Sequence, residues 1–354
     1  MNSILRILIP IALLILSQAA DLTAAEAAPA YKTFRGVVHV HTNYSHDSNA
    51  TLPFILEKAE ELDFDFVMIA DHNTLAAVEA YEKMKAPPRP LFIFGDEIST
   101  GGGHMIAWGI KEHPPEDKSP QELIDLVHAQ GGFVFLAHPF SVKEPWEDLN
   151  LEGWDGFELY DFGHELMADS NVIDFAFRSI SEDSKTMLES AQKVSEKSLA
   201  FWNEVTQKRN VPVIAGADAH LERYQKYFVM ALQSVSLYVL AGDLKEKEIL
   251  EAVRRGRSFL AFDTQGKAFE FFFWAEAGGE RFEMGDTLKN LAPVTFHVRL
   301  PASASVRLLR SGEIVKEETT QDLTFESDKP GVYRIEVFLN EKPWIYSNPI
   351  YIQS

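Results

Sequence analysis

Cysteine is absent from the 354-residue sequence, and this absence limits how the chain is stabilised and how it binds metal. A chain without cysteine has neither disulfides nor thiolate ligands. Any metal site must therefore be built from histidine, aspartate and glutamate side chains.

Positive charge is also scarce. The sequence has 33 Lys and Arg against 53 Asp and Glu, which gives a formal net charge of −20. A strongly acidic chain repels polyanions, so nucleic acid is not an expected partner. The same charge disfavours a phosphate substrate unless local cations offset it. The sequence also lacks a Gly-rich phosphate loop, a serine nucleophile motif and a nucleotide-binding fingerprint.

Long hydrophobic runs are missing except near the N-terminus. Residues 7–16 form an apolar run of ten behind Arg6, and small residues follow it. We predict a signal peptide over residues 1–28, cleaved after Ala19 or Ala27, because the run is short for a membrane span. A membrane anchor is the alternative. The signal peptide implies an exported protein, periplasmic or secreted, with no membrane span once it is removed.

Strand and helix patterns alternate between residues 31 and 265. The expected strands are 36–41, 64–70, 90–99, 104–110, 133–139, 156–160, 211–220 and 257–262, and the expected helices are 51–62, 74–85, 119–132 and 243–256. Continuous apolar strands that alternate with helices indicate a parallel α/β domain. The length suits a TIM-like barrel or a distorted relative, with residues 161–209 as a helical insertion over one rim.

The pattern changes near residue 266. The expected strands beyond it are 268–277, 292–300, 304–310, 313–320, 331–339 and 348–353. Short strands split by Gly, Pro, Asn and Asp are typical of an all-β domain, which we expect to be a small sandwich over residues 266–354. Trp274 and Trp344 are expected in its core, with sugar binding as the alternative.

Imidazole and carboxylate side chains gather at the ends of the expected strands of the first domain. The candidate ligands are His39, His41, Asp47, His72, Glu97, His104, His138, Asp218 and His220. Because the carboxyl ends of parallel strands meet at one rim, these nine side chains should converge. Carboxylates packed this densely need cations, and imidazole with carboxylate suits Zn, Mn or Fe. The sequence therefore predicts two or three divalent metal ions.

Some neighbouring residues have open assignments. His46 is an alternative ligand to Asp47, since both follow the same strand. Asp71 is expected to orient His72, with a turn or helix cap as the alternative. Arg223 is a candidate to hold a substrate phosphate bidentately, or else an ordinary surface arginine. Four histidines lie outside the strand-end pattern and are expected to be surface or core residues, namely His113, His128, His164 and His297.

The segments HVHTNYSHDS, IADHNT, GDEIST, AHP and GADAH resemble the successive motifs of the PHP superfamily, the polymerase-and-histidinol-phosphatase metallohydrolases. The resemblance covers residues 34–262. The segments RRGRSFLAF and SNPIYI also resemble parts of its exported, CehA-like branch, in which a β domain often follows. The resemblance implies a distorted (β/α)7 barrel of the PHP type.

The resemblance also implies how the ligands are shared among the metals. One metal would be held by His39, His41, Glu97 and Asp218, a second by Glu97 with His104 and His138, and a third by Asp47, His72 and His220. Relatives often carry Asp-Gly where this chain has Asp47-Ser48, a difference that removes no ligand. Glu97, His138 and Asp218 are the ligands expected to serve catalysis.

The expected function is a metal-dependent phosphoesterase that cleaves a small phosphomonoester or phosphodiester. A metal-bridging hydroxide would attack the phosphorus atom. The metals would neutralise the charge on the phosphoryl oxygens. One alternative is a hydrolase of carboxylesters, carbamates or amides that uses the same centre. Another is a non-catalytic binding module stabilised by metals, although structural zinc sites are closed by four protein ligands.

Overall fold

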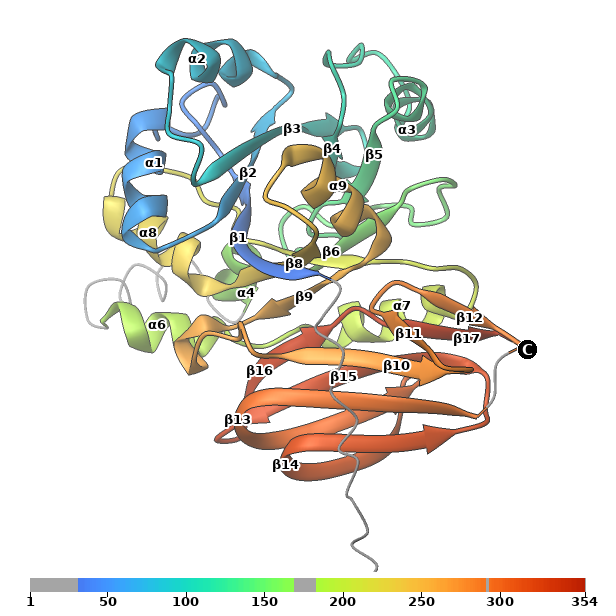
Figure 1. Cartoon of the computed structure of the whole chain (residues 1–354). Coiled ribbons are helices and arrows are strands. Elements are labelled where there is room, and N and C mark those ends of the chain that lie inside the picture. Colours follow the sequence, from blue (N-terminus) through green and yellow to red (C-terminus); the bar gives the residue numbers. More distant parts are fainter. Residues whose placement is uncertain (1–30, 169–182, 291–292, 354) are drawn as a thin grey trace, which may run out of the picture. The chain divides into compact units, whose positions relative to one another are not determined.

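The computed structural model describes residues 31–168, 183–290 and 293–353 (Figure 1). The predicted signal peptide lies outside the described residues, and so does part of the predicted insertion. None of the helices in the described part of the chain is long and apolar enough to cross a membrane.

Residues 31–265 form nine strands and eight helices within the described ranges. The strands are β1 (Lys32–Val40), β2 (Phe66–His72), β3 (Leu91–Thr100), β4 (Gly103–Trp108), β5 (Phe133–Leu136), β6 (Gly156–Asp161), β7 (Val213–Gly216), β8 (Ser236–Ala241) and β9 (Ser258–Ala261). The helices are α1 (Leu52–Glu61), α2 (Ala76–Met84), α3 (Pro120–Ala129), α4 (Phe162–Ala168), α6 (Ser184–Ala191), α7 (Glu196–Thr206), α8 (Gln225–Ser234) and α9 (Glu246–Arg255). All the expected elements are present, and α8 and β8 are additional.

Local sequence signals explain several helix ends. The Thr51 hydroxyl accepts a hydrogen bond from the Phe54 N–H at the start of α1. Ser119 and Glu122 form a reciprocal capping box at the start of α3. Gly256 ends α9 with a φ of 76°, a left-handed conformation that glycine adopts without a steric penalty.

The strand directions differ from the expected parallel sheet at β4 and at β8 and β9, since β8 is antiparallel to both β1 and β9. β1, β2 and β3 are parallel neighbours, and so are β5, β6 and β7. β4, however, is antiparallel to both β3 and β5. The prediction of an all-parallel sheet is therefore wrong at β9 and also at β4. At β4 the physical reason is the connection, because only Gly101 and Gly102 separate β3 from β4, whereas a parallel pair needs a crossover of a dozen or more residues.

Backbone hydrogen bonds join β1 to the segment that follows β7. The Ala217 N–H donates to the Val38 carbonyl at 2.9 Å, and the Ala219 N–H donates to the His39 carbonyl at 3.1 Å. The first half of β1 pairs instead with β8, which is antiparallel to it. The two ends of the β1–β7 series thus meet through a short bridge, and the closed seven-stranded barrel stays a prediction.

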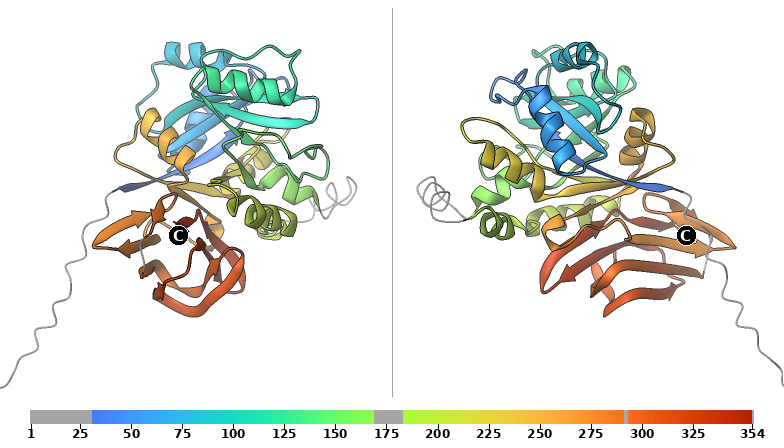
Figure 2. Two further views of the ribbon diagram at one scale, coloured as in Figure 1. Left: turned by 90° about the vertical axis from the view of Figure 1, so that its right-hand side faces the viewer. Right: turned by 60° about the vertical axis from the view of Figure 1, so that its left-hand side comes forward.

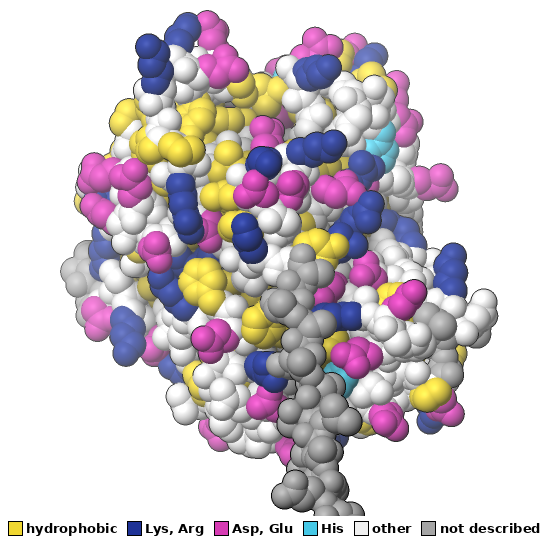
Figure 3. All heavy atoms as spheres, viewed as in Figure 1, with side chains coloured by type: hydrophobic (Ala, Val, Ile, Leu, Met, Phe, Trp, Pro, Cys, Tyr) yellow, Lys and Arg dark blue, Asp and Glu magenta, His cyan; other side chains and the backbone are white. Residues whose placement is uncertain are grey.

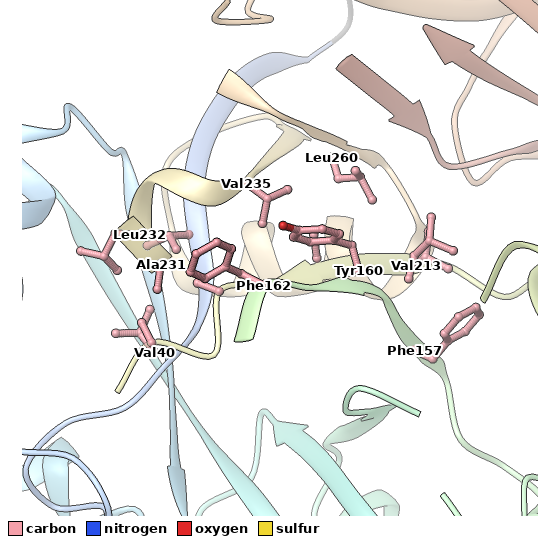
Figure 4. Close-up of a cluster of buried hydrophobic side chains, with 14 of the residues drawn as sticks. Val40, Phe157, Tyr160, Phe162, Val213, Ala231, Leu232, Val235 and Leu260 are labelled. Carbon is pink, nitrogen blue, oxygen red and sulfur yellow. The ribbon is translucent and has the colours of Figure 1, made fainter. Parts of the chain in front are cut away.

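Apolar side chains fill both faces of these strands. Figure 4 shows one buried cluster, in which Val40 of β1, Tyr160 of β6 and Leu232 of α8 lie together with Phe162 of α4. A second cluster combines β1–β5 with one face of α9. The site described below is thus supported by elements that are packed on both sides.

The C-terminal region is rich in strands, as expected. They are β10 (Phe272–Ala277), β11 (Glu280–Glu283), β12 (Thr287–Lys289), β13 (Val294–Arg310), β14 (Glu313–Ser327), β15 (Gly331–Leu339), β16 (Lys342–Ser347) and β17 (Ile350–Gln353). β13 is one long strand where two were expected, because a bulge between Arg299 and Ala304 accommodates Pro301 without ending the pairing. Figure 2 shows these strands, orange to red, curling around a common core. The sandwich arrangement itself stays a prediction.

Backbone pairing connects the two regions. β16 is antiparallel to β9, and Tyr238 and Phe259 share a buried cluster with Trp344. Trp274 and Trp344 are both buried, which confirms the expectation that they belong to the core. The division into domains at residue 266 stays a prediction.

Candidate metal centre

Glu97, near the end of β3, lies at the centre of the histidine cluster. Its Oε2 is 2.9 Å from His39 Nε2 and 3.2 Å from His41 Nε2. Its Oε1 is 3.0 Å from His104 Nδ1 and 3.2 Å from His138 Nε2. Each carboxylate oxygen therefore faces its own set of imidazoles, with His72 Nδ1 also 3.4 Å from Oε2, and such an arrangement suits a carboxylate that bridges two cations.

Asp218, just beyond β7, completes a group of four with His39, His41 and Glu97. Asp218 Oδ1 lies 3.4 Å from the Nε2 atoms of both His39 and His41. The ligand atoms of these four residues all lie within 4.8 Å of one another. This spacing is small enough for one ion to contact all four.

A further group of candidate ligands consists of His41, Asp47, His72 and His220. Asp47 Oδ2 is 3.2 Å from His72 Nε2 and 3.2 Å from His220 Nε2, and the four ligand atoms again lie within 4.8 Å. The side chain of His46 is 73% exposed, with its Nε2 4.0 Å from Asp47 Oδ2. The geometry therefore favours Asp47 over His46 as a ligand.

The β3–β4 hairpin positions His104 beside Glu97. His104 lies opposite Ser99 in the antiparallel pair, so it starts a strand instead of ending one. It forms a group with His72 and Glu97. The structure thus brings all nine predicted ligands together.

Three candidate ligands have unusual backbone conformations. φ is 64° at His39, 29° at His138 and 45° at Asp218, a region that residues other than glycine seldom adopt. At His39 the pairing of β1 with β2 shifts between Val38 and Val40. Such conformations cost about 1–3 kcal/mol each and persist where the surroundings enforce them, often at functional sites.

Residues 38–266 match the PHP domain family, and this stretch contains every candidate ligand. The chain belongs to the PHP domain family.

Individual proteins are also similar to this PHP chain. The uncharacterized protein MJ1587 of Methanocaldococcus jannaschii is 30% identical over 138 residues, which are 35% of this chain and 81% of that protein. A two-domain protein of Bacteroides vulgatus, containing a predicted PHP-like metal-dependent phosphoesterase, has a TM-score of 0.49 at 15% identity and covers 91% of this chain and 96% of that one. An amidohydrolase of Chromobacterium violaceum with bound sulfate has a TM-score of 0.34 at 12% identity, over 53% of this chain and 87% of that one. At these scores and identities neither structure establishes an activity for this chain.

Two buried carboxylates of β6 support the centre of the PHP domain and were not foreseen. Glu158 Oε1 lies 2.9 Å from His39 Nδ1, and Glu158 Oε2 accepts the backbone N–H of His138 at 2.8 Å. A carboxylate only accepts, so His39 Nδ1 carries the hydrogen and Nε2 is left for a metal. Asp161, three residues on, forms a group with His39 and Glu158. The available signal was an acidic residue inside the apolar strand pattern FELYD.

His164 of α4 also belongs to the site, so its assignment as a surface or core residue was wrong. Its Nε2 lies 3.8 Å from Asp218 Oδ2 and 3.9 Å from Asp161 Oδ1, and its ring centre lies 4.3 Å from that of His138. No strand-end pattern marks it, because α4 follows β6 without a loop. Elsewhere, His113 and His128 hydrogen-bond to Asp residues, and His297 stacks on Trp274.

Asp71 has a different role from the one expected. Its two carboxylate oxygens accept hydrogen bonds from the backbone N–H and the hydroxyl of Thr42, both at 2.6 Å. Among the described residues it has no hydrogen bond to His72, whose Nδ1 lies 3.4 Å from Glu97 Oε2 instead. Asp71 therefore fixes the segment that follows His41.

The charges of the cluster stabilise one another. Burial alone would raise the pKa of Glu97, but the neighbouring His39, His104 and His138 hold it well below its usual value. Burial would lower the pKa of His138, and contact with Glu97 instead raises it to about 9. His220 behaves in the same way, since Asp218 and Asp47 outweigh burial and raise its pKa to about 9.

The donor set fits divalent cations. Several buried ring nitrogens have no hydrogen-bond partner among the described residues, namely His41 Nε2, His72 Nδ1, His138 Nδ1 and His220 Nε2. Buried polar atoms are normally paired, so unpaired ring nitrogens in this number fit metal ligands, which a metal would bind with release of their protons. Imidazole and carboxylate without thiolate suit zinc, manganese or iron.

A cavity of about 630 Å³ opens beside the cluster. Asp47, Glu97, His138 and Asp218 line it, which leaves the ligand groups accessible from one side. Arg223 lies on the same lining, as the phosphate-binding hypothesis requires, and is exposed.

Proposed function

We propose that this PHP protein is a metal-dependent hydrolase of small phosphomonoesters or phosphodiesters. The observation that carries the proposal is Glu97, which lies between two pairs of imidazoles at the wall of an open cavity. A structural metal site is closed by its protein ligands. Here some candidate ligands belong to more than one metal-binding group, and several line an open cavity. This arrangement fits a reactive metal centre better than a binding module stabilised by metals.

Two or three divalent ions, when bound, would supply a water acidic enough to attack at neutral pH and would offset the negative phosphate. In the overall reaction, the water oxygen joins phosphorus, the P–O bond to the alcohol breaks, and the alcohol leaves with a proton. These cations would also offset the repulsion between a phosphate substrate and a chain with a net charge of −20. On the face shown in Figure 3, acidic and basic side chains intermingle, which gives no support for a nucleic-acid partner.

The residues of the chain orient the ligands and the substrate. Glu158 holds His39 in one tautomer, and the backbone N–H of His138 is fixed by the same carboxylate. Arg223 and Lys143 line the cavity, which supports a role for both in binding phosphoryl oxygens. A small phosphoester is therefore the partner that we propose.

We further propose that the strands β1–β7 form a distorted barrel of the PHP type and that the protein is exported, as in the CehA-like branch. The bonds from Ala217 and Ala219 to β1 support the first point. The apolar run at residues 7–16 supports the second. Fractionation of cells that express the full chain tests export, which is refuted if the uncleaved protein stays in the cytoplasm.

The test of function combines metal analysis with substrate panels. Protein purified without chelators should contain two or three equivalents of Zn, Mn or Fe. It should cleave aryl phosphates faster than aryl carboxylesters, carbamates or amides, and a chelator should abolish the activity. Glu97→Gln should lose metal and at least ~100-fold in rate. Preferred cleavage of carbonyl substrates would favour the alternative hydrolase, and full phosphatase activity in Glu97→Gln would refute the proposed centre.

A further inference from the structure

The cavity beside the metal centre has an apolar half as well as a polar one. On the polar side it is lined by candidate ligands, from Asp47 to His220. On the other side it is lined by Phe162, Leu166, Tyr224, Tyr227 and Ala231. Phe162, Leu166 and Ala231 also belong to the buried core, whereas Tyr224 is mostly exposed and Tyr227 partly exposed, so these two rings are the part of the wall most accessible to a ligand.

Exposed apolar side chains gather on the loops that carry the ligands. Four large ones are exposed among the described residues, namely Tyr44, Val142, Tyr224 and Ile314. Tyr44 follows β1, Val142 follows β5 and Tyr224 follows β7, so three of the four lie on connections that supply ligands. Single exposed hydrophobics are ordinary, but Tyr224 lines the cavity itself, and so does Lys143, the neighbour of Val142.

Tyr224 and Tyr227 form the outer part of this wall. The side chain of Tyr224 is 63% exposed, and the two rings lie edge to face with their centres 6.0 Å apart. Tyr227 lies on the first turn of α8, one turn from Tyr224. Such a pair presents one ring face to a third aromatic or apolar group.

Two cations lie on the same lining. Lys143 and Arg223 are exposed, and neither side chain makes an ion pair within the described residues. The cavity therefore offers metal ligands and two cations for a phosphoryl group and an apolar wall for whatever is attached to it. The ligand that matches both halves has an anionic end and an apolar end.

We propose that the apolar wall holds the alcohol part of the substrate, so that this protein acts on phosphoesters of aryl or other extended apolar alcohols. The inference rests on the proposed function, because the phosphoryl end must sit at the metal centre. Burying a benzyl group against this wall in place of an ethyl group should improve binding by roughly 10- to 100-fold.

The experiment compares benzyl phosphate with ethyl phosphate on the full protein with added Mn²⁺ or Zn²⁺. Both alcohols are weak acids of similar strength, so intrinsic reactivity is nearly matched. The kcat/KM of benzyl phosphate should exceed that of ethyl phosphate by at least ~10-fold, which is ~1.4 kcal/mol. Calorimetry with benzylphosphonate and ethylphosphonate, which are not hydrolysed, should give the same order of affinities.

Two variants localise the effect. The double variant Tyr224→Ser, Tyr227→Ala should bring the benzyl-to-ethyl ratio close to one. The control is Ile314→Ser, which removes another exposed apolar side chain, on β14, and should leave the ratio unchanged. A ratio near one in the unaltered protein, or an unchanged ratio in the double variant, would overturn the inference.

The phosphonates separate this inference from the proposed function. If neither phosphate is cleaved, the proposed function fails, and the binding data then decide the inference alone. Tighter binding of benzylphosphonate that disappears in the double variant would still support the apolar subsite. Equal binding of the two phosphonates, or no binding of either, would overturn it.

Discussion

Glu97 has the environment of a shared ligand and not that of a proton donor. Its side chain is buried, and burial by itself favours the neutral acid. Contacts with four imidazoles reverse this preference and hold the pKa well below its usual value. The carboxylate is therefore ionised at neutral pH, as a bridging ligand must be, and proton donation to a leaving group has to come from elsewhere.

The choice between Asp47 and His46 can be tested directly. Asp47→Ala should remove one metal equivalent per chain, because its carboxylate joins His72 to His220. His46→Ala is the matched control and should keep the full metal content, since its side chain is mostly exposed. Elemental analysis of both purified variants checks the prediction. Loss of metal from His46→Ala alone would reverse the assignment.

Asp71 should affect both stability and metal affinity through its two hydrogen bonds with Thr42. Asp71→Ala leaves a buried N–H and a hydroxyl without their acceptor, and we expect a loss of about 3 kcal/mol in the free energy of unfolding. Because Thr42 follows His41, metal affinity should also fall, by roughly 10- to 100-fold. Asp71→Asn keeps one acceptor and should lose about half as much stability. Urea unfolding and metal titration measure both effects, and an Asp71→Ala protein of normal stability would contradict the role.

The sequence was sufficient to predict that these nine imidazole and carboxylate side chains come together, because each stands beside a strand or turn with a clear local signature. Glu158 and His164 lack such a signature. Glu158 is defined by its contact with His39, 119 residues away in the chain, and His164 by a helix that starts directly after β6. Contacts of this range depend on strand register, which periodicity alone does not specify.

At the scale of elements, the paired strands β6 and β7 position Glu158, which contacts the candidate ligands His39 and His138. Gly216 of β7 faces Glu158 so closely that a Cβ there would lie 2.2 Å from Glu158 Oε1 and 2.8 Å from Asp161 Oδ2. A side chain at this position would therefore displace the carboxylate of Glu158. The close approach of the two strands allows Glu158 to reach His39.

Gly216→Ala should displace Glu158 and thereby release His39 Nδ1. We expect metal affinity to fall by roughly 10- to 100-fold and stability by about 1–3 kcal/mol. Gly101→Ala is the matched control, because its Cβ would meet nothing within 4 Å. Metal titration and thermal unfolding of both variants test this, and unchanged affinity in Gly216→Ala would show that Glu158 does not position His39.

Most elements could be predicted from periodicity and capping residues, but two kinds could not. α8 and β8 form one nearly continuous apolar stretch, with the change from helix to strand at Val235, and such a stretch carries no clear period. The direction of β4 depends on the length of a loop. Its pattern of apolar residues is the same for a parallel and an antiparallel strand.

For the molecule as a whole, the C-terminal strands make hydrogen bonds and buried contacts with the PHP region. The side chain of Tyr351 accepts a hydrogen bond from the Val211 N–H at 3.0 Å, and Trp344 Nε1 donates to the Gly266 carbonyl at 2.8 Å. Together with the pairing of β9 and β16, these contacts place residues of both regions in one buried cluster. We therefore expect the described chain to unfold as one unit.

Asn348 provides the sharpest test of this coupling. Its amide accepts from the Val213 N–H at 2.8 Å and donates to the Val213 carbonyl at 2.9 Å, so a C-terminal residue satisfies both backbone groups at the start of β7. Asn348→Ala leaves these buried groups unpaired, and we expect a loss of about 2–4 kcal/mol in the free energy of unfolding. Asn150→Ala, at an exposed asparagine, is the control and should change stability little.

In Asn348→Ala, near-UV circular dichroism and metal release should shift together to lower denaturant, because β7 leads directly to the ligands Asp218 and His220. A shift of the circular dichroism alone, with metal release unchanged, would mean that the C-terminal strands unfold independently of the metal centre. Their removal would then leave a functional PHP domain, whereas coupled unfolding requires the strands for the site to form.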